Sequence, residues 1–77
     1  MSAHLPVFRG AKPSEAITER DLHICALVTE GLTNQEIAAA IGTTENMAKN
    51  YLRFIYNKTG MGNRVELALW YLEHHDN

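Results

Sequence analysis

The chain has 77 residues, a hydrophobic content of 45% and a formal net charge of −2. This length suits one small domain, and a single cysteine excludes an internal disulfide that would stabilise it. No apolar run approaches the roughly 20 residues that a membrane-spanning helix needs, and no signal-peptide pattern opens the chain, so we expect a cytoplasmic protein with no membrane partner.

Both prolines fall within residues 1–16, which show no helical or strand period. We therefore expect this segment to be an N-terminal arm, irregular or partly ordered. Residues 17–77 are expected to form the folded domain. Its first helix is predicted to follow Thr18, which can cap the helix together with Asp21 three residues later. Apolar residues at helical spacing predict a buried stripe in that helix: Ile17, Ile24, Leu27 and Val28.

Three further helices are predicted from cap and stop signals. A short one begins at Thr33, with Glu36 three residues later, and ends at Gly42. Its apolar residues at helical spacing are Ile37, Ala40 and Ile41. A longer helix has Thr43 or Thr44 as its cap and Gly60 as its terminator, and the last helix begins near Asn63. With no strand pattern between them, the predicted fold is an all-α, four-helix domain.

The third predicted helix, about residues 44–59, sorts its side chains by charge. Residues 46–65 contain no acidic residue but hold four of the seven basic ones. At about 100° per residue, one face carries amide and basic groups, and the opposite face carries apolar ones. Asn and Arg offer directed hydrogen bonds that suit base edges, and Lys supplies charge. We expect the base-facing residues to be Asn46, Lys49, Asn50 and Arg53. The alternative is an exposed face that merely lacks acids.

The two middle helices are joined through Gly-Thr-Thr at residues 42–44, which predicts a helix-turn-helix that places its second helix in the major groove of DNA. Free N–H groups at the start of the first of these helices can meet a phosphate. The expected phosphate contacts are Thr33, Asn34, Gln35, Thr44, Asn57 and Lys58. Thr33 has a cap as its alternative role. For Arg64 we favour pairing with a carboxylate such as Asp21 over DNA contact.

The last predicted helix has two apolar sides. One is expected to be its core stripe: Val65, Ala68, Leu69 and Leu72. The other indicates a partner surface, and we expect it to form a homodimer interface: Leu67, Trp70, Tyr71 and His74. A twofold dimer would present two recognition helices to two half-sites. The alternative is that the N-terminal arm, through Leu5, Val7 and Phe8, covers this side.

Residues 17–72 resemble the LuxR/GerE-type DNA-binding domain. The resemblance is carried by "TERD" at 18–21, "GLTNQEIA" at 31–38, Lys49, "KTG" at 58–60 and "NRVE" at 63–66. It implies a four-helix fold, base recognition by the third helix and dimerisation through the fourth. It also implies base or phosphate contacts by Lys49, Asn50 and Arg53, and backbone contacts by Asn34, Gln35 and Lys58. The chain departs from the family pattern at Met47, Ala48, Tyr51 and Thr59. Relatives usually carry a further domain ahead of this one, and the initial Met favours a stand-alone regulator over an excised domain.

No arrangement of residues in the sequence indicates catalysis. The four histidines lack metal-ligand spacing, and the lone cysteine cannot complete a zinc site, so no metal or cofactor is expected. Cys25 lies at a core position of the first helix, where inert packing is the usual role. We expect no enzyme.

The main hypothesis is a sequence-specific, dimeric DNA-binding transcription regulator acting on double-stranded DNA in the bacterial nucleoid. RNA polymerase or a related regulator is its further candidate partner. The alternative is a protein-interaction module that sequesters a related regulator through the last helix without reading DNA.

Overall fold

The computed structural model describes residues 16–74, which form four helices and no strand. These are α1 (Glu19–Thr29), α2 (Asn34–Ile41), α3 (Glu45–Thr59) and α4 (Arg64–His74). The predicted all-α, four-helix fold is therefore confirmed. The expected arm at residues 1–16 lies outside the described residues except for Ala16.

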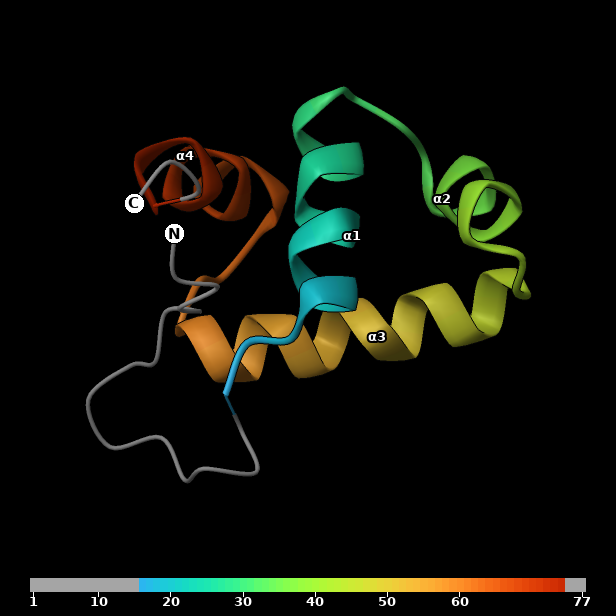
Figure 1. Ribbon diagram of the computed structural model, residues 1–77, viewed down its shortest axis with the longest axis horizontal. Coiled ribbons are helices and arrows are strands. Elements are labelled where there is room, and N and C mark those ends of the chain that lie inside the picture. The colour runs from blue at the N-terminus through green and yellow to red at the C-terminus, as the bar shows by residue number, and fades with distance from the viewer. Residues whose placement is uncertain (1–15, 75–77) are drawn as a thin grey trace.

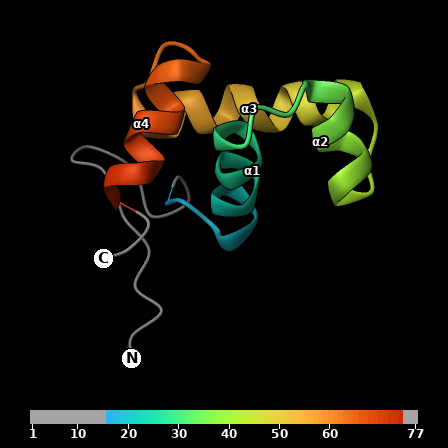
Figure 2. The same cartoon turned by 90° about the horizontal axis from the view of Figure 1, so that it is seen from above.

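The helices are arranged around α1. In Figure 1, α1 stands across the middle of α3, with α2 near one end of α3 and α4 on the other side of α1. The view from above shows the same order, with α1 between α4 and α2 (Figure 2). α4 packs mainly against α1, and α2 packs mainly against α3. The pair α2–α3 is the predicted helix-turn-helix.

Local hydrogen bonds define where the helices begin. The Thr18 hydroxyl accepts from the backbone N–H of Asp21 at 3.1 Å, and the Asp21 carboxylate accepts from the N–H of Thr18 at 3.0 Å. Thr33 and Glu36 form the same reciprocal capping box on α2. These two predicted capping boxes are confirmed, and Thr44 rather than Thr43 caps α3. Each cap satisfies N–H groups that have no partner within the helix.

The turn between α2 and α3 depends on Gly42. Its φ of 78° lies in the left-handed region, where a side chain would strain the backbone. This conformation lets the N–H of Thr43 bond back to the carbonyl of Ala38 at 2.8 Å. The chain then reverses directly into the Thr44 cap, which sets the angle between α2 and α3.

The core is built mainly from the predicted stripes. All four residues predicted for α1 are buried, and Cys25 is buried with them. On the apolar side of α3, Ala48, Leu52 and Ile55 are also buried, whereas Tyr51 is half-buried and Met47 is exposed. In α2 the alanine in the core is Ala38, and Ala40 is exposed, which corrects the prediction.

The orientation predicted for α4 is wrong. Leu67 is 0% exposed and Trp70 is also buried, whereas Val65 is 70% exposed and Leu69 and Leu72 face outward. Because both sides of this helix are apolar, its periodicity defines two stripes but does not choose between them. Packing against α1 buries the side that carries Trp70. Leu67 and Trp70 are therefore core residues, and the predicted dimer interface must be revised.

Candidate nucleic-acid interface

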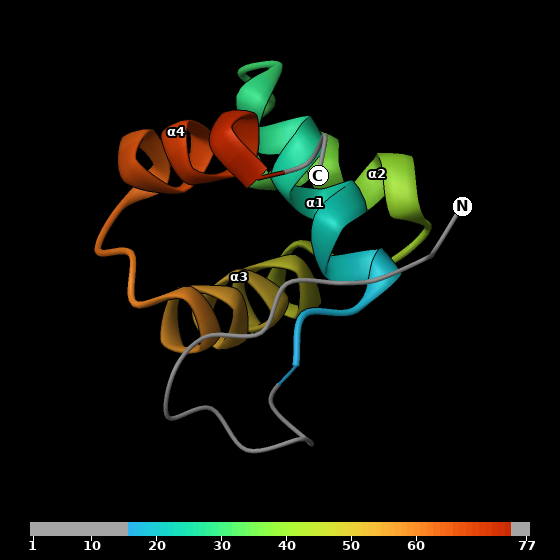
Figure 3. The same ribbon diagram turned by 60° about the vertical axis from the view of Figure 1, so that its left-hand side comes forward.

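The polar face of α3 is open to solvent. The five residues predicted for it are exposed: Asn46, Lys49, Asn50, Arg53 and Asn57. The buried side chains of Ala48, Leu52 and Ile55 hold the opposite side of α3 against the rest of the domain. The long side of α3 away from α1 is left uncovered by α1, α2 and α4 in Figures 1 and 3. The sequence-predicted face is thus a real surface of the folded domain.

Basic groups gather along the edge of this face that adjoins α2. An open hollow of about 220 Å³ lies there, lined by Asn34, Lys49, Leu52, Arg53, Tyr56 and Arg64. Burial raises the pKa of Tyr56, and the nearby Arg64 charge partly opposes this effect while Cys25 adds a smaller upward contribution. The phenol therefore stays protonated at neutral pH and keeps a hydrogen to donate. The hollow offers cationic and neutral donors to an anion.

Arg64 joins the start of α4 to the start of α2. Its Nη1 donates to Oδ1 of Asn34 at 2.8 Å, and its Nη2 donates to the carbonyl of Leu32 at 2.6 Å. The predicted structural role of Arg64 is confirmed, but the expected partner, Asp21, is not the one observed. The Asn34 oxygen is also engaged within the fold. Its predicted phosphate contact would therefore have to come from the rest of the side chain or from the backbone.

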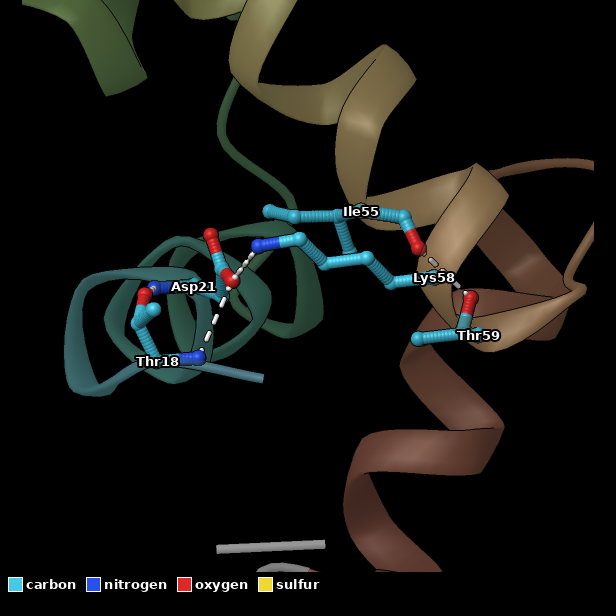
Figure 4. A network of polar contacts seen from close by, with 5 residues as sticks. All are labelled: Thr18, Asp21, Ile55, Lys58 and Thr59. Atoms are coloured by element: carbon cyan, nitrogen blue, oxygen red, sulfur yellow. Dashed lines mark hydrogen bonds and ion pairs between the residues drawn. The ribbon is translucent and has the colours of Figure 1, made fainter. Parts of the chain in front are cut away.

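Asp21 is instead paired with Lys58. The Lys58 Nζ donates to the Asp21 Oδ2 at 2.7 Å, and that carboxylate also caps α1 (Figure 4). Lys58 thus holds the C-terminal end of α3 against the N-terminal end of α1. The phosphate contact expected of Lys58 stays a prediction, and a phosphate would have to compete with a close, part-buried carboxylate for its ammonium group. Thr59, drawn beside it, is buried and donates to the carbonyl of Ile55 at 2.9 Å.

The remaining predicted phosphate contacts lie at helix starts. Thr33, Gln35 and Thr44 are exposed. The Thr33 and Thr44 hydroxyls accept cap hydrogen bonds, so the cap role of Thr33 is confirmed and its phosphate contact stays a prediction. The N-terminus of α2 lies beside the basic hollow, since Asn34, the first residue of α2, lines it. A helix N-terminus there favours a negative charge.

Arg20 is a cation near α3 that the predicted site left out. Its guanidinium carbon lies 4.2 Å from the ring centroid of Tyr51, within cation–π range. Arg20 is exposed, and the contact ties the first turn of α1 to the middle of α3. The "TERD" motif contains this arginine, but its position beside α3 depends on how α1 crosses α3.

Comparison with known protein families matches residues 15–71 to "Bacterial regulatory proteins, luxR family". The chain belongs to this family. This agrees with the helix-turn-helix of α2 and α3, and the predicted resemblance is confirmed. Membership of this family assigns the chain to DNA binding and regulation of transcription.

Several bacterial transcription and response regulators are similar in sequence to this chain. The transcriptional regulatory protein LiaR of Bacillus subtilis is 32% identical over 66 residues, which cover 86% of this chain and 31% of LiaR. The DNA-binding transcriptional activator DevR/DosR of Mycobacterium tuberculosis is 33% identical over 76 residues, 94% of this chain and 35% of that protein. The response regulator Rre1 of Synechocystis is 37% identical over 57 residues, 74% of this chain and 25% of Rre1. The chain thus spans about a third or less of the length of these relatives.

This LuxR-family domain carries a second exposed surface, on α4. Val65, Leu69 and Leu72 form its apolar part, which we call the α4 face. It adjoins an open hollow of about 480 Å³ between α4 and the end of α1, lined by Val28, Gly31, Leu32, Thr33, Arg64, Val65, Ala68 and Leu69. Of the residues predicted for a dimer interface, Leu67 and Trp70 are buried, and Tyr71 and His74 are half-buried. The alternative of a sequestering module stays a prediction, but Leu67 and Trp70, which it was expected to use, are not at the surface.

Two further properties of residues 16–74 concern membranes and metals. No helix in this part of the chain is long and apolar enough to cross a membrane. Nor do any three His, Cys, Asp or Glu side chains among these residues gather to hold a metal ion. His4 and His75 lie outside the described residues.

Proposed function

We propose that the chain is the sequence-reading module of a transcription regulator, with α3 lying in the major groove of double-stranded DNA. The observation that carries this proposal is the exposure of an acid-free face of amide and basic side chains on α3. A helix with its side chains is about 10–12 Å across, and the major groove is about 12 Å wide, so the face can reach base edges. Asn46, Lys49, Asn50 and Arg53 are the proposed base-reading residues.

Contacts to the phosphates would orient the helix in the groove. The basic hollow beside Asn34 and the start of α2 supply donors to one strand, together with Thr33, Gln35, Thr44 and Asn57. Arg20 supplies a cation near the middle of α3. Lys58 is omitted from the proposed set because Asp21 holds it. These few contacts predict modest affinity, since neutralising phosphates provides much of the binding free energy.

The module is proposed to act as a dimer through the α4 face. Val65, Leu69 and Leu72 would bury their apolar surface against the same residues of a second copy, as a twofold interface requires. Two copies would then present two α3 helices to two half-sites. This interface replaces the one predicted around Leu67 and Trp70.

Selection of duplexes from a random pool tests the proposal. The expected result is an enriched motif made of two related half-sites, with affinity that falls as salt rises. Arg53→Ala should abolish enrichment of that motif, because it removes a charged donor from the α3 face. His23→Glu is a matched control: it makes the same change in net charge at an exposed position of α1, and it should keep the motif.

Two results would contradict the proposal. One is the absence of binding to any duplex at low salt. The other is equal loss of binding in Arg53→Ala and His23→Glu, which would assign the interaction to net charge rather than to the α3 face. Circular dichroism of each variant confirms that the helices are retained.

A further inference from the structure

The exposed face of α3 is not uniformly polar. Met47 is 40% exposed and Phe54 is 60% exposed, and neither is among the partly buried side chains that pack against the core. With Asn46 set at 0°, they fall at about 100° and 80°, beside Asn50 at about 40°. They are seven residues apart, so they lie one above the other on one stripe, about two turns apart. We call this pair the apolar strip.

The strip gives α3 two unlike edges around a centre of asparagines. Lys49 and Arg53 lie at about 300° and 340°, on the edge that adjoins the basic hollow. Met47 and Phe54 lie on the other edge. Core packing does not explain the strip, and a solvated helix face gains nothing from an exposed phenylalanine. An apolar edge beside groups suited to base edges therefore calls for an occupant that is itself part polar and part apolar.

The floor of the major groove has this character. Each base pair presents hydrogen-bonding groups there, and each thymine adds an apolar C5-methyl group that phenylalanine and other apolar side chains contact. The strip is continuous with an acid-free face whose charge is complementary to DNA. Met47 and Phe54 are separated along the helix axis by about 10.5 Å, which is roughly three base-pair steps of 3.4 Å.

We propose that Met47 and Phe54 read thymine methyl groups, so that the chain requires thymine at defined positions of its half-site. This inference rests on the proposed function, because it assigns a specificity to the same face of α3. On that face the amide and basic groups would bind polar base edges. The strip would distinguish thymine from cytosine and from a thymine that lacks its methyl group.

Replacement of thymine by deoxyuracil tests the proposal. This change removes the methyl group and leaves the hydrogen-bonding edge of the base in place. In the half-site selected by the wild-type chain, each thymine is replaced in turn, and Kd is measured by fluorescence anisotropy. We expect about fourfold weaker binding for each methyl group that the strip contacts, the value for burying one carbon group.

Variants of the strip assign the effect to its residues. Phe54→Ala should lose the deoxyuracil penalty at one thymine, and Met47→Ala should lose it at a different thymine. Phe54→Leu is the matched control, since it keeps a large apolar side chain and should keep the penalty. Both positions are exposed, so the variants should fold.

The outcomes separate this inference from the proposed function. If the wild-type chain selects no duplex, both are overturned. If it selects a motif but the half-site lacks thymine, or deoxyuracil changes Kd less than twofold everywhere, the inference alone is overturned. It is also overturned if either alanine variant keeps every wild-type penalty, a result that would assign the strip to another partner.

Discussion

Lys58 and Asp21, 37 positions apart in the sequence, form an ion pair of 2.7 Å that joins the end of α3 to the beginning of α1. The same carboxylate caps α1 through the N–H of Thr18. One buried side chain therefore caps the start of α1 and holds the end of α3. This pair adds to the core packing that holds α3 against the rest of the domain, which makes Lys58 a structural residue first.

Lys58→Met should destabilise the fold. It leaves the Asp21 carboxylate, whose side chain is only 5% exposed, without its charged partner. We expect a loss of about 1.5–3 kcal/mol in the free energy of unfolding, the usual contribution of a hydrogen bond to a charged group. Urea unfolding measures the change. Lys49→Met, on the exposed face of the same helix, is the control and should stay within about 0.5 kcal/mol. Equal stability of the two variants would show that the pair does not support the fold.

Arg64→Lys should also destabilise the domain although the charge is kept. A lysine has one nitrogen at its end and cannot reproduce the two guanidinium nitrogens that donate to Leu32 and Asn34. We expect a cost of about 1–2 kcal/mol, measured by the urea midpoint. Arg53→Lys is the matched change at an exposed position and should cost less than about 0.5 kcal/mol. An Arg64→Lys variant with the same urea midpoint as the wild type would mean that charge alone is needed there.

Leu69→Glu should dissociate the proposed dimer without unfolding the monomer. Leu69 lies in the centre of the α4 face and is exposed in the single chain, so its replacement removes no core packing. A glutamate would place like charges opposite each other in a twofold interface. Sedimentation equilibrium should show a monomer, and binding to a two-half-site duplex should weaken. Ala39→Glu, at an exposed position of α2, should remain dimeric. A dimeric Leu69→Glu variant would place the interface elsewhere.

Stability should fall at high pH because of Cys25. Burial raises the pKa of its thiol from 9.0 to about 12, and the Asp21 carboxylate adds to the effect. The thiol of the unfolded chain ionises near pH 9, while the thiol of the folded chain stays protonated. The stabilisation that the Cys25 thiol gives the folded state is therefore complete below pH 9 and is lost between about pH 9 and 12. In this range the free energy of unfolding can fall by up to about 1.4 kcal/mol per pH unit.

Cys25→Ala isolates this effect. Alanine cannot ionise, so the variant should be less stable at pH 7 yet lose less stability between pH 8 and 11. Tyr56, whose pKa burial also raises, is present in both chains, and the variant removes only the smaller upward contribution of Cys25 to that pKa. Parallel pH profiles for the two chains would contradict the prediction.

Much of the fold follows from interactions within four residues along the chain. The Thr18–Asp21 and Thr33–Glu36 capping boxes, and the glycine that ends α3, are local, so their residue types predict helix boundaries correctly. The polar face of α3 is predictable for a similar reason. Only one of its sides is apolar enough to enter a core, so helical geometry alone assigns the other side to solvent.

The tertiary structure decided what local rules leave open. The two sides of α4 are both apolar, and contact with α1 determines that Trp70 enters the core and Leu69 remains outside. Lys58, and not Arg64, pairs with Asp21 because the crossing of α1 and α3 brings these two side chains together. Helix periodicity and capping act along the chain, whereas the choice between two equivalent partners depends on distances through space that exist only once the helices have packed.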